Sequence, residues 1–392
     1  MRVSHLSLRN WRNYAESELP FPPGTTLLIG PNGQGKTNLV EAIGYLATLS
    51  SHRVSDDAAL VKQHEDSAVI RARLEHEHRT LVVDMVVNRK GANRVQLGGA
   101  PAKARDLPAQ LDVIQFAPED LSLVRGDPTG RRRFLDELLV HRSPRMAGAL
   151  SDYDRALRQR NTLLKSIRSV DVSGAQSRTL DAWDERLATA GSEILAGRVA
   201  LVCELDGPVR EAYQAVAGSE HVTGLALRMS IDGIQADDAN IADVDGATSP
   251  LARSREELTT RFLAALQASR RAELERGLTL IGPHRDELQL GLNGLPARGY
   301  ASHGESWSYA LALRLGSARL LRTTSLHGDP VLILDDVFAE LDEGRRARLA
   351  TAVADFEQIL VTAAVEADVP AALSGHRVRV NAGRLFSGTD SE

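Results

Sequence analysis

The spacing of hydrophobic positions predicts strands in the N-terminal third of the chain. Apolar and polar residues alternate near the N-terminus, and short apolar runs bounded by turn residues follow. This period of two is typical of strands, and the closely spaced central segments predict an antiparallel meander. The predicted strands lie at residues 3–8, 26–29, 68–74, 80–87, 94–97 and 112–116.

The middle of the chain has the spacing of helices instead. Apolar residues recur there at intervals of three, four and seven, which places them on one helical face. The pattern predicts two antiparallel helical arms of about 25 residues, joined near residues 172–174. Residues 232–250, rich in Asp, Gly and Ala, predict a loop, and residues 255–276 predict a further helix.

Strands and helices alternate again toward the C-terminus. Helices are predicted at residues 305–322 and 343–353, and strands at residues 331–334 and 358–361. An α/β pattern at both ends with helices between them predicts one α/β domain assembled from both termini, with a helical lobe inserted into it. The expected boundaries are 1–125 and 276–392 for the α/β domain and 126–275 for the lobe.

The charge of the chain is unevenly distributed. The 392 residues carry a formal net charge of −5, which excludes a globally basic nucleic-acid binder but not a local basic surface. Residues 125–168 hold eleven lysines and arginines against five acids. A local basic surface is therefore expected on this segment.

Composition also indicates where the protein works. Cys203 is the sole cysteine of the sequence, so no disulfide within the chain and no cysteine-based zinc site can form. The arginine-rich N-terminus lacks the apolar core of a signal peptide, and no uncharged apolar stretch approaches 18 residues. We therefore expect a cytoplasmic protein without a membrane partner.

The strongest motif is Gly30-x-x-x-x-Gly35-Lys36-Thr37, which follows a predicted strand and opens a predicted helix. Glycines let backbone N–H groups close around phosphate oxygens, and the helix N-terminus adds positive potential. We expect Lys36 to hold the β- and γ-phosphates of ATP and Thr37 to bind Mg²⁺. The expected nucleotide-binding residues are Gly30, Pro31, Asn32, Gly33, Gln34, Gly35, Lys36 and Thr37.

A second motif places two carboxylates at the end of a buried strand. Four apolar residues precede Asp335 and Asp336, and an α/β sheet binds its ligand at the carboxyl ends of its strands. We expect Asp335 to support Mg²⁺ and Asp336 to polarise the attacking water. The two motifs lie 299 residues apart, counted from Lys36 to Asp335, which is more than a compact nucleotide hydrolase needs.

A serine motif, Ser302-His303-Gly304-Glu305, precedes the acid pair. Its order relative to the other motifs resembles that of the SMC-type ATP-binding-cassette ATPases. This resemblance implies that Ser302 and Gly304 contact the γ-phosphate bound by the opposite protomer of a dimer. A helix N-cap with a capping-box glutamate is the alternative interpretation of the same four residues.

Nearly the whole chain resembles the RecF family of bacterial DNA replication and repair proteins. The matching segments are residues 8–14, 30–37, 116–121, 126–136, 282–288 and 334–342. The resemblance implies an SMC-type ATPase head with a helical lobe, a DNA-binding ATPase that dimerises with ATP at gapped DNA. It further implies cooperation with RecO and RecR in loading RecA, and support of replication restart and the SOS response.

The resemblance also suggests roles for single residues. Gln115 matches the residue that links Mg²⁺ and the attacking water to the helical lobe, and Arg12 matches a nucleotide contact, with a salt bridge as its alternative. The chain departs from the pattern at Glu305, where Gln is more common, and at Thr362, where many cassette ATPases have histidine. Because Asp336 also reaches less far than Glu, we expect slow hydrolysis that serves as a switch.

Two basic clusters are the DNA-binding candidates, the triplet Arg131, Arg132 and Arg133 and a helical set of Arg155, Arg158, Arg160 and Lys165. The alternative is a solvated helix face, with one of the triplet paired to Asp136 or Glu137.

His284 and Asp286 are spaced like metal ligands, but a structured turn is the favoured interpretation.

Two other function classes share the ATPase motifs, a transporter ATPase subunit and a clamp that binds ATP without turnover.

Overall fold

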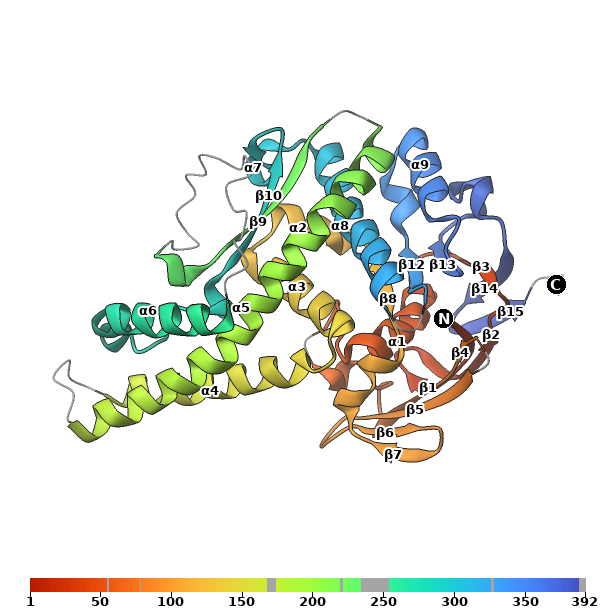
Figure 1. Cartoon of the computed structure of the whole chain (residues 1–392). Coiled ribbons are helices and arrows are strands. Elements are labelled where there is room, and N and C mark those ends of the chain that lie inside the picture. Colours follow the sequence, from red (N-terminus) through yellow and green to blue (C-terminus); the bar gives the residue numbers. More distant parts are fainter. Residues whose placement is uncertain are drawn as a thin grey trace. The chain divides into compact units, whose positions relative to one another are not determined.

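The structure is a computed structural model, and it describes residues 1–54, 56–77, 79–167, 174–218, 221–233, 254–325 and 328–387. The chain forms two compact units (Figure 1). The first comprises Met1–Asp120, Glu211–Glu220 and Trp307–Glu392, and the second comprises Leu121–Arg210 and His221–Ser306. No helix among the described residues combines the length and apolar composition needed to cross a membrane.

The first unit contains two six-stranded sheets. One is antiparallel, in the order β2-β1-β4-β5-β6-β7, and the other, β15-β14-β3-β13-β12-β8, is parallel except for its edge strand β15. Their strands are β1 (Arg2–Trp11), β2 (Tyr14–Pro20), β3 (Gly24–Ile29), β4 (Ser67–His76), β5 (Arg79–Asn88), β6 (Arg94–Leu97), β7 (Ala100–Ala102), β8 (Val113–Phe116), β12 (Val331–Asp335), β13 (Gln358–Ala363), β14 (His376–Asn381) and β15 (Arg384–Ser387).

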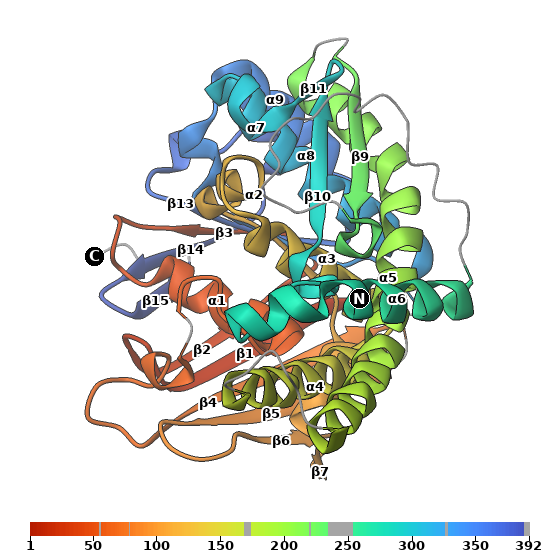
Figure 2. The ribbon, with the colours of Figure 1, turned by 90° about the vertical axis from the view of Figure 1, so that its left-hand side faces the viewer.

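One hydrophobic core joins the two sheets. Helix α1 (Lys36–Thr48) lies between them and contributes Leu39, Val40 and Ile43, which are fully buried (Figures 1 and 2). Helix α9 (Glu343–Val353) connects β12 to β13. Because β3, β8, β12 and β13 run parallel, the residues that follow them meet at one edge of the sheet, which brings the sequence motifs together.

The second unit is mainly helical. Its elements are α2 (Leu121–Arg125), α3 (Pro128–Arg142), α4 (Met146–Ser166), α5 (Gly174–Ala217), α6 (Arg255–Arg276), α7 (Ala297–Tyr300), the start of α8 (His303–Thr324), and a small antiparallel sheet of β9 (Thr223–Arg228), β10 (Glu287–Leu292) and β11 (Leu295–Pro296). Helices α5 and α8 each extend from this unit into the first. Leu164 of α4 packs against Leu180 of α5, so the two helices are antiparallel arms as predicted.

Several predicted elements are confirmed. Helices α6 and α9 have the predicted bounds, and β4, β5 and β6 form the predicted antiparallel meander. The prediction was wrong for the second arm, because α5 is one helix of 44 residues rather than about 25. The predicted loop at 232–250 and the centre of the predicted arm connection lie almost wholly outside the described residues. The predicted domain boundaries remain a prediction.

Candidate functional site

The P-loop backbone depends on its glycines. A Cβ atom on Gly30 would stand 2.1 Å from the carbonyl oxygen of Val380, which leaves room for glycine alone. Gly33 and Gly35 have φ angles of +79° and +116°, in the region that favours glycine. Gly35 is the N-cap of α1 and provides no side-chain cap, so N–H groups of the first turn remain available for an anion.

Lys36 is buried inside this loop. Its Nζ donates to the carbonyl oxygens of Gly30 at 2.8 Å and Pro31 at 3.2 Å, and to Oδ1 of Asn32 at 3.3 Å. The ammonium group therefore lies at the centre of the loop that the sequence predicted for phosphate. These neutral acceptors leave its positive charge unpaired by any carboxylate among the described residues.

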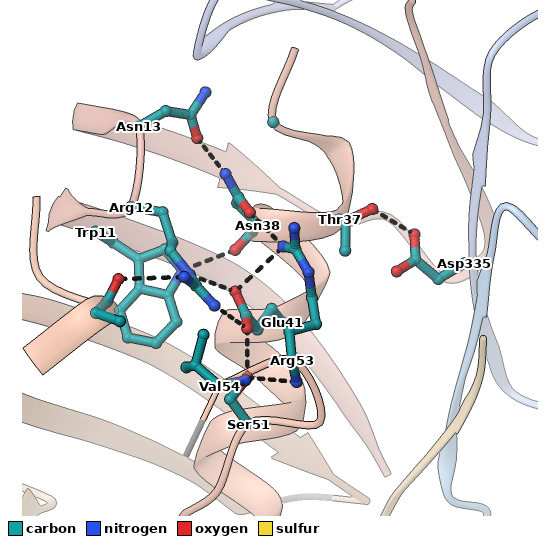
Figure 3. Close-up of polar contacts among 12 residues, drawn as sticks. Trp11, Arg12, Asn13, Thr37, Asn38, Glu41, Ser51, Arg53, Val54 and Asp335 are labelled. Atoms are coloured by element: carbon teal, nitrogen blue, oxygen red, sulfur yellow. Dashed lines mark hydrogen bonds and ion pairs between the residues drawn. The ribbon is translucent and has the colours of Figure 1, made fainter. Parts of the chain in front are cut away.

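Thr37 and Asp335 meet at the carboxyl edge of the parallel sheet (Figure 3). Oγ1 of Thr37 donates to Oδ1 of Asp335 at 3.0 Å, and Oγ1 of Thr362 donates to the same oxygen at 2.6 Å. Burial raises the pKa of Asp335 to about 6, although both hydroxyl groups oppose the shift. No basic side chain among the described residues forms an ion pair with Asp335, so this buried carboxylate is suited to a divalent cation.

The pair of Thr37 and Asp335 fits Mg²⁺ by chemistry, since both supply oxygen ligands. Gln115, the third expected ligand, lies on β8 beside Ile333, and its Nε2 is buried without a hydrogen-bond partner in the described structure. Its Oε1 lies against Gly44, two helical turns along α1 from Thr37. The structure therefore brings Thr37 and Asp335 together but leaves the Gln115 amide apart from them.

Thr362 is a site residue that the sequence analysis did not recognise. Besides donating to Asp335, its Oγ1 accepts the backbone N–H of Asp336 at 2.9 Å. One threonine thus holds both acidic residues from the neighbouring strand, where β13 runs beside β12. The signal in the sequence is a polar residue near the end of a buried strand, at the position where many cassette ATPases have histidine.

Asp336 adopts a left-handed backbone conformation, with φ 51° and ψ 20°. Such angles are uncommon for residues other than glycine and are often found at functional positions. The side chain provides no cap to the short helix that follows, which ends at the exposed Glu340. The carboxylate of Asp336 is therefore not used in capping that helix.

The raised pKa of Asp335 predicts that Asp335→Asn stabilises the nucleotide-free protein. The folded-state pKa, about 6, exceeds the usual 3.8, so the folded state binds the proton more tightly than the unfolded state. The charged carboxylate therefore lowers the free energy of unfolding. This destabilisation grows as pH rises from about 4 to 6 and reaches its full value, roughly 3 kcal/mol, above pH 6. Asparagine keeps an Oδ1 acceptor for both threonines.

Urea unfolding in EDTA measures this effect. The variant should be more stable than the original chain at pH 8, and the gain should shrink as pH falls toward 4. A gain of equal size at both ends of this range would contradict the assignment of the raised pKa to Asp335.

Arg12 lies in an ion pair beside the P-loop helix. Its Nε and Nη2 donate to the two carboxylate oxygens of Glu41 at 2.8 and 2.5 Å, and its Nη1 donates to the carbonyl oxygen of Ala59 at 3.1 Å. Arg12 also lines a pocket of about 440 Å³ together with Asn13 and Asn38. The salt bridge, our alternative for Arg12, is therefore present, and the side chain still borders a cavity near the P-loop.

The serine motif forms a capping box at the start of α8. The backbone N–H of Ser302 donates to Oε2 of Glu305 at 2.7 Å, and Oγ of Ser302 accepts the N–H of Glu305 at 3.3 Å. Ser302 and His303 are exposed, and Gly304 is half-buried. Glu305 thus has a structural role as the reciprocal cap, and the Ser302 edge of the helix faces solvent in the monomer.

The arginine triplet separates into three environments. Arg131 is buried, with Nε and Nη2 on Glu287 at 2.6 and 3.1 Å and Nη1 on two backbone carbonyls. Arg132 donates to the carbonyl oxygen of Asp286, and Arg133 is exposed and donates to Glu137 at 2.7 Å. The expectation of a DNA contact is therefore wrong for Arg131, because its guanidinium is enclosed; the predicted pairing with Glu137 occurs at Arg133.

Arg160, in the second cluster, is fully buried. It donates to Asp184 at 2.7 Å, to Glu273 at 2.6 Å and to Oγ1 of Thr279 at 2.8 Å, and so joins α4 to α5 and α6. A buried arginine requires such partners, because an unpaired charge in the interior is costly. Arg160 was wrongly included among the DNA-binding candidates, since a 3.6-residue pattern does not show which charge faces the core.

The remaining members of that cluster are exposed. The side chains of Arg155 and Arg158 are 70% and 69% exposed, and each faces an aspartate on the same helix. Lys165 is also exposed, seven residues beyond Arg158 and thus on the same helical face. These three residues remain candidates for phosphate contacts.

His284 and Asp286 belong to a hydrogen-bonded turn. Nδ1 of His284 lies 2.6 Å from the hydroxyl of Tyr153, and Asp286 accepts from the backbone N–H and the hydroxyl of Ser230 at 2.9 and 3.1 Å. Burial lowers the pKa of His284 to about 4 and raises that of Asp286 to about 6. No cluster of metal-binding side chains occurs in the part of the chain that the structure describes.

Comparison with known proteins agrees with this geometry. The family model for the RecF/RecN/SMC N-terminal domain matches residues 2–383. The DNA replication and repair protein RecF of Clavibacter michiganensis subsp. michiganensis is 57% identical over 98% of this chain and 96% of its own length.

Solved structures show the same fold. The structure of the recombination mediator RecF–ATP of the RecFOR pathway covers 99% of this chain, with 97% of its own chain matched, 25% identity and a TM-score of 0.84. The Smc head domain of Pyrococcus furiosus shares the fold at a TM-score of 0.53, 14% identity, and coverage of 98% of this chain and 96% of that chain. The fold is thus the SMC-type ATPase head with a helical lobe, and the chain belongs to the RecF family of DNA replication and repair proteins.

Proposed function

We propose that the protein is an ATP-dependent DNA-binding protein of recombinational repair and replication restart. As an ATP-bound homodimer it clamps gapped DNA and, with RecO and RecR, helps to load RecA. Loading of RecA also supports the SOS response. The protein acts in the cytoplasm, at the nucleoid. The observation that carries the proposal is the meeting of Lys36, Thr37 and Asp335 at one sheet edge. Family membership supports the rest.

ATP is held by the P-loop in this proposal. The backbone from Gly30 to Gly35 surrounds the phosphates, Lys36 supplies a full charge to the β- and γ-phosphates, and Arg12 contacts the nucleotide. Thr37 and Asp335 would hold Mg²⁺, and Gln115 would become a further ligand by turning its amide toward them from its place beside Gly44. When bound, Mg²⁺ neutralises charge on the phosphates.

Asp336 polarises the attacking water in this scheme, with Gln115 linking the site to the helical lobe. Thr362 keeps the Asp336 backbone in place through its hydroxyl group. The Thr362 hydroxyl donates its single proton to Asp335, so it cannot also donate to the γ-phosphate as a histidine at this position could. In addition, the side chain of Asp336 reaches less far than that of Glu. These features support slow turnover, suited to a switch rather than a motor.

Ser302→Arg is expected to leave ATP binding by the monomer unchanged and to abolish ATP-dependent dimerisation. In the proposed dimer Ser302 and Gly304 contact the nucleotide of the partner, so a bulky cation at the exposed Ser302 blocks closure. Light scattering with and without ATP measures the dimer. Ser302→Ala removes the cap without adding bulk, at a cost of about 1 kcal/mol, and separates the two effects. Dimerisation by the arginine variant would place the serine motif outside the interface.

Replacing Arg155, Arg158 and Lys165 together with Gln is expected to weaken binding to all DNA sequences alike. Each phosphate contact releases counterions, so each lost contact lowers the slope of log affinity against log salt by about 0.9 on duplex DNA. Three lost contacts would lower the slope by between two and three. Fluorescence anisotropy at several salt concentrations measures it, and ATP affinity should not change.

A matched control removes three exposed arginines of the first unit, Arg71, Arg105 and Arg377, which also face carboxylates. This control variant changes the net charge of the chain by the same amount as the α4 variant does. An equal loss of slope in both triple variants would mean that overall charge, rather than the α4 face, determines binding. An unchanged slope in the α4 variant would exclude that face from the DNA contact.

A further inference from the structure

Glu41 is a buried carboxylate that neither the P-loop motif nor the acid pair explains. It lies on α1 one turn after Thr37, and its side chain is 1% exposed. We propose that Glu41 is a positioning residue of the nucleotide site, which holds Arg12 and Arg53 at the wall of the adjoining pocket so that they contact the nucleoside part of ATP. This inference rests on the proposed ATP binding.

Two segments of the chain, at Arg12 and at Ser51–Arg53, converge on this carboxylate (Figure 3). Oε1 accepts from Nη2 of Arg12 at 2.5 Å and from Oγ of Ser51 at 2.6 Å, and Oε2 accepts from Nε of Arg12 at 2.8 Å. Nη1 of Arg53 lies 3.8 Å from Oε2. Paired N–H groups on one carboxylate fix the plane of the Arg12 guanidinium as well as its position.

The spacing on α1 explains why Arg53 is held as well. Asn38 and Glu41 are three residues apart and therefore neighbours on one helical face. Oδ1 of Asn38 accepts from Nη1 of Arg53 at 2.7 Å, and Nδ2 of Asn38 donates to Asn13 at 2.8 Å. Asn13 in turn donates to the carbonyl oxygen of Gln34 at 3.1 Å, so this network reaches the P-loop itself.

The pocket beside this network has the lining of a nucleoside site. Arg12, Arg53 and Arg89 border it with the amides of Asn13 and Asn38 and the aliphatic Val61, and none of the described residues that line it is acidic. Amides and guanidinium groups suit the hydroxyl groups and ring atoms of a nucleoside, and the aliphatic surface suits a base. Because Asn13 and Asn38 flank the P-loop, phosphates held there direct the nucleoside toward this pocket.

Glu41 acts on the ligand through the groups that it holds, which are Arg12 and, together with Ser51, the segment that carries Arg53. Its own oxygens are occupied and buried, whereas the Arg12 side chain is 14% exposed and that of Arg53 is 37% exposed. A long arginine side chain loses much rotamer freedom when it is fixed, and a preformed ion pair removes that cost from ligand binding. Without the carboxylate the two guanidinium groups have no common anchor on α1.

The test compares two ligands that share phosphates but differ in the nucleoside. Glu41→Gln keeps the side-chain volume and should weaken binding of a fluorescent ATP analogue by roughly tenfold, the effect of one or two charge-assisted hydrogen bonds. Its affinity for inorganic tripolyphosphate, measured by competition, should change less than twofold. Lys36→Ala should weaken both ligands, so failure of the P-loop assignment and failure of this inference are distinguishable.

A double-mutant cycle isolates positioning from general stability. Arg12→Ala combined with Arg53→Ala should weaken the ATP analogue by at least a similar factor, and adding Glu41→Gln to this pair should have little further effect, because the carboxylate acts through the two arginines. The matched control is Glu273→Gln, another buried carboxylate paired with an arginine, in the second unit. It should lower the melting temperature without changing the ratio of the two affinities.

Three outcomes would overturn the inference. Equal losses for the ATP analogue and tripolyphosphate would assign Glu41 to the phosphate loop, and unchanged affinities would leave it without a role in binding. Fully additive losses in the cycle would show that Glu41 does not act through the two arginines. If Glu41→Gln does not fold, Glu41→Asp keeps the charge but shortens the side chain, and the same selective loss for the ATP analogue is expected.

Discussion

Lys36→Ala is expected to lower affinity for ATP by at least about 100-fold. Lys36 supplies the full positive charge inside the P-loop, and its three donors now bind only neutral oxygens of that loop. Charge-assisted hydrogen bonds to the phosphates each contribute about 1.5–3 kcal/mol, and two such bonds account for a loss of this size. Equilibrium titration with a fluorescent ATP analogue measures it.

Lys103→Ala is the matched control, because Lys103 is an exposed lysine of the same unit. It should bind the analogue as tightly as the original chain does. Unchanged affinity in Lys36→Ala would remove the basis for assigning ATP to this loop. A melting temperature measured without nucleotide separates loss of binding from loss of the fold.

Asp336→Asn is expected to retain ATP binding and to slow hydrolysis by about 10²–10⁴-fold, the typical contribution of a general base. Lys36 and Thr37 remain in place, and the backbone N–H of Asp336 still donates to Thr362. In the proposed switch, closure requires ATP and opening requires its hydrolysis, so the variant should accumulate as an ATP-bound dimer. Phosphate release and light scattering give the two measurements.

Glu340→Gln is the control for this variant. Glu340 is exposed at the end of the short helix after Asp336, so it is the nearest alternative acid in the sequence. Turnover at the original rate in Asp336→Asn, together with loss in Glu340→Gln, would reassign the water-polarising role. Absence of phosphate release by the unmodified protein, with and without DNA, would favour a clamp that binds ATP without turnover.

The parallel sheet and its motifs were predictable because their signals are local. A buried apolar run followed by Gly30 or by Asp335 is a short pattern, and parallel strands bring their carboxyl ends to one edge. The contact between Thr37 and Asp335 follows from these two facts although the residues are far apart in sequence. The starts of helices α6 and α9 were predictable because a polar N-cap residue, Ser254 or Asp342, precedes each helix, and Gly277 marks the end of α6.

Other features depend on tertiary contacts that no local pattern contains. Arg131 and Arg160 resemble exposed basic residues in the sequence, yet Glu287 and Glu273, more than a hundred residues away, pair with them in the interior. The role of Thr362 depends on β13 lying beside β12. Sequence patterns identify which residues are charged or polar, but distant partners decide which of them face solvent.

The contact between the P-loop and the C-terminal strands constrains how the protein is made. Strand β3 pairs with β13 on one side and β14 on the other, and residues 382 and 383 donate backbone N–H groups to Gln34. At about 5–20 residues per second, a ribosome adds these strands roughly 20–70 seconds after residues 30–37. A growing chain therefore carries the P-loop sequence well before it has the strands that shape the loop, and ATP can assist only the last stage of folding.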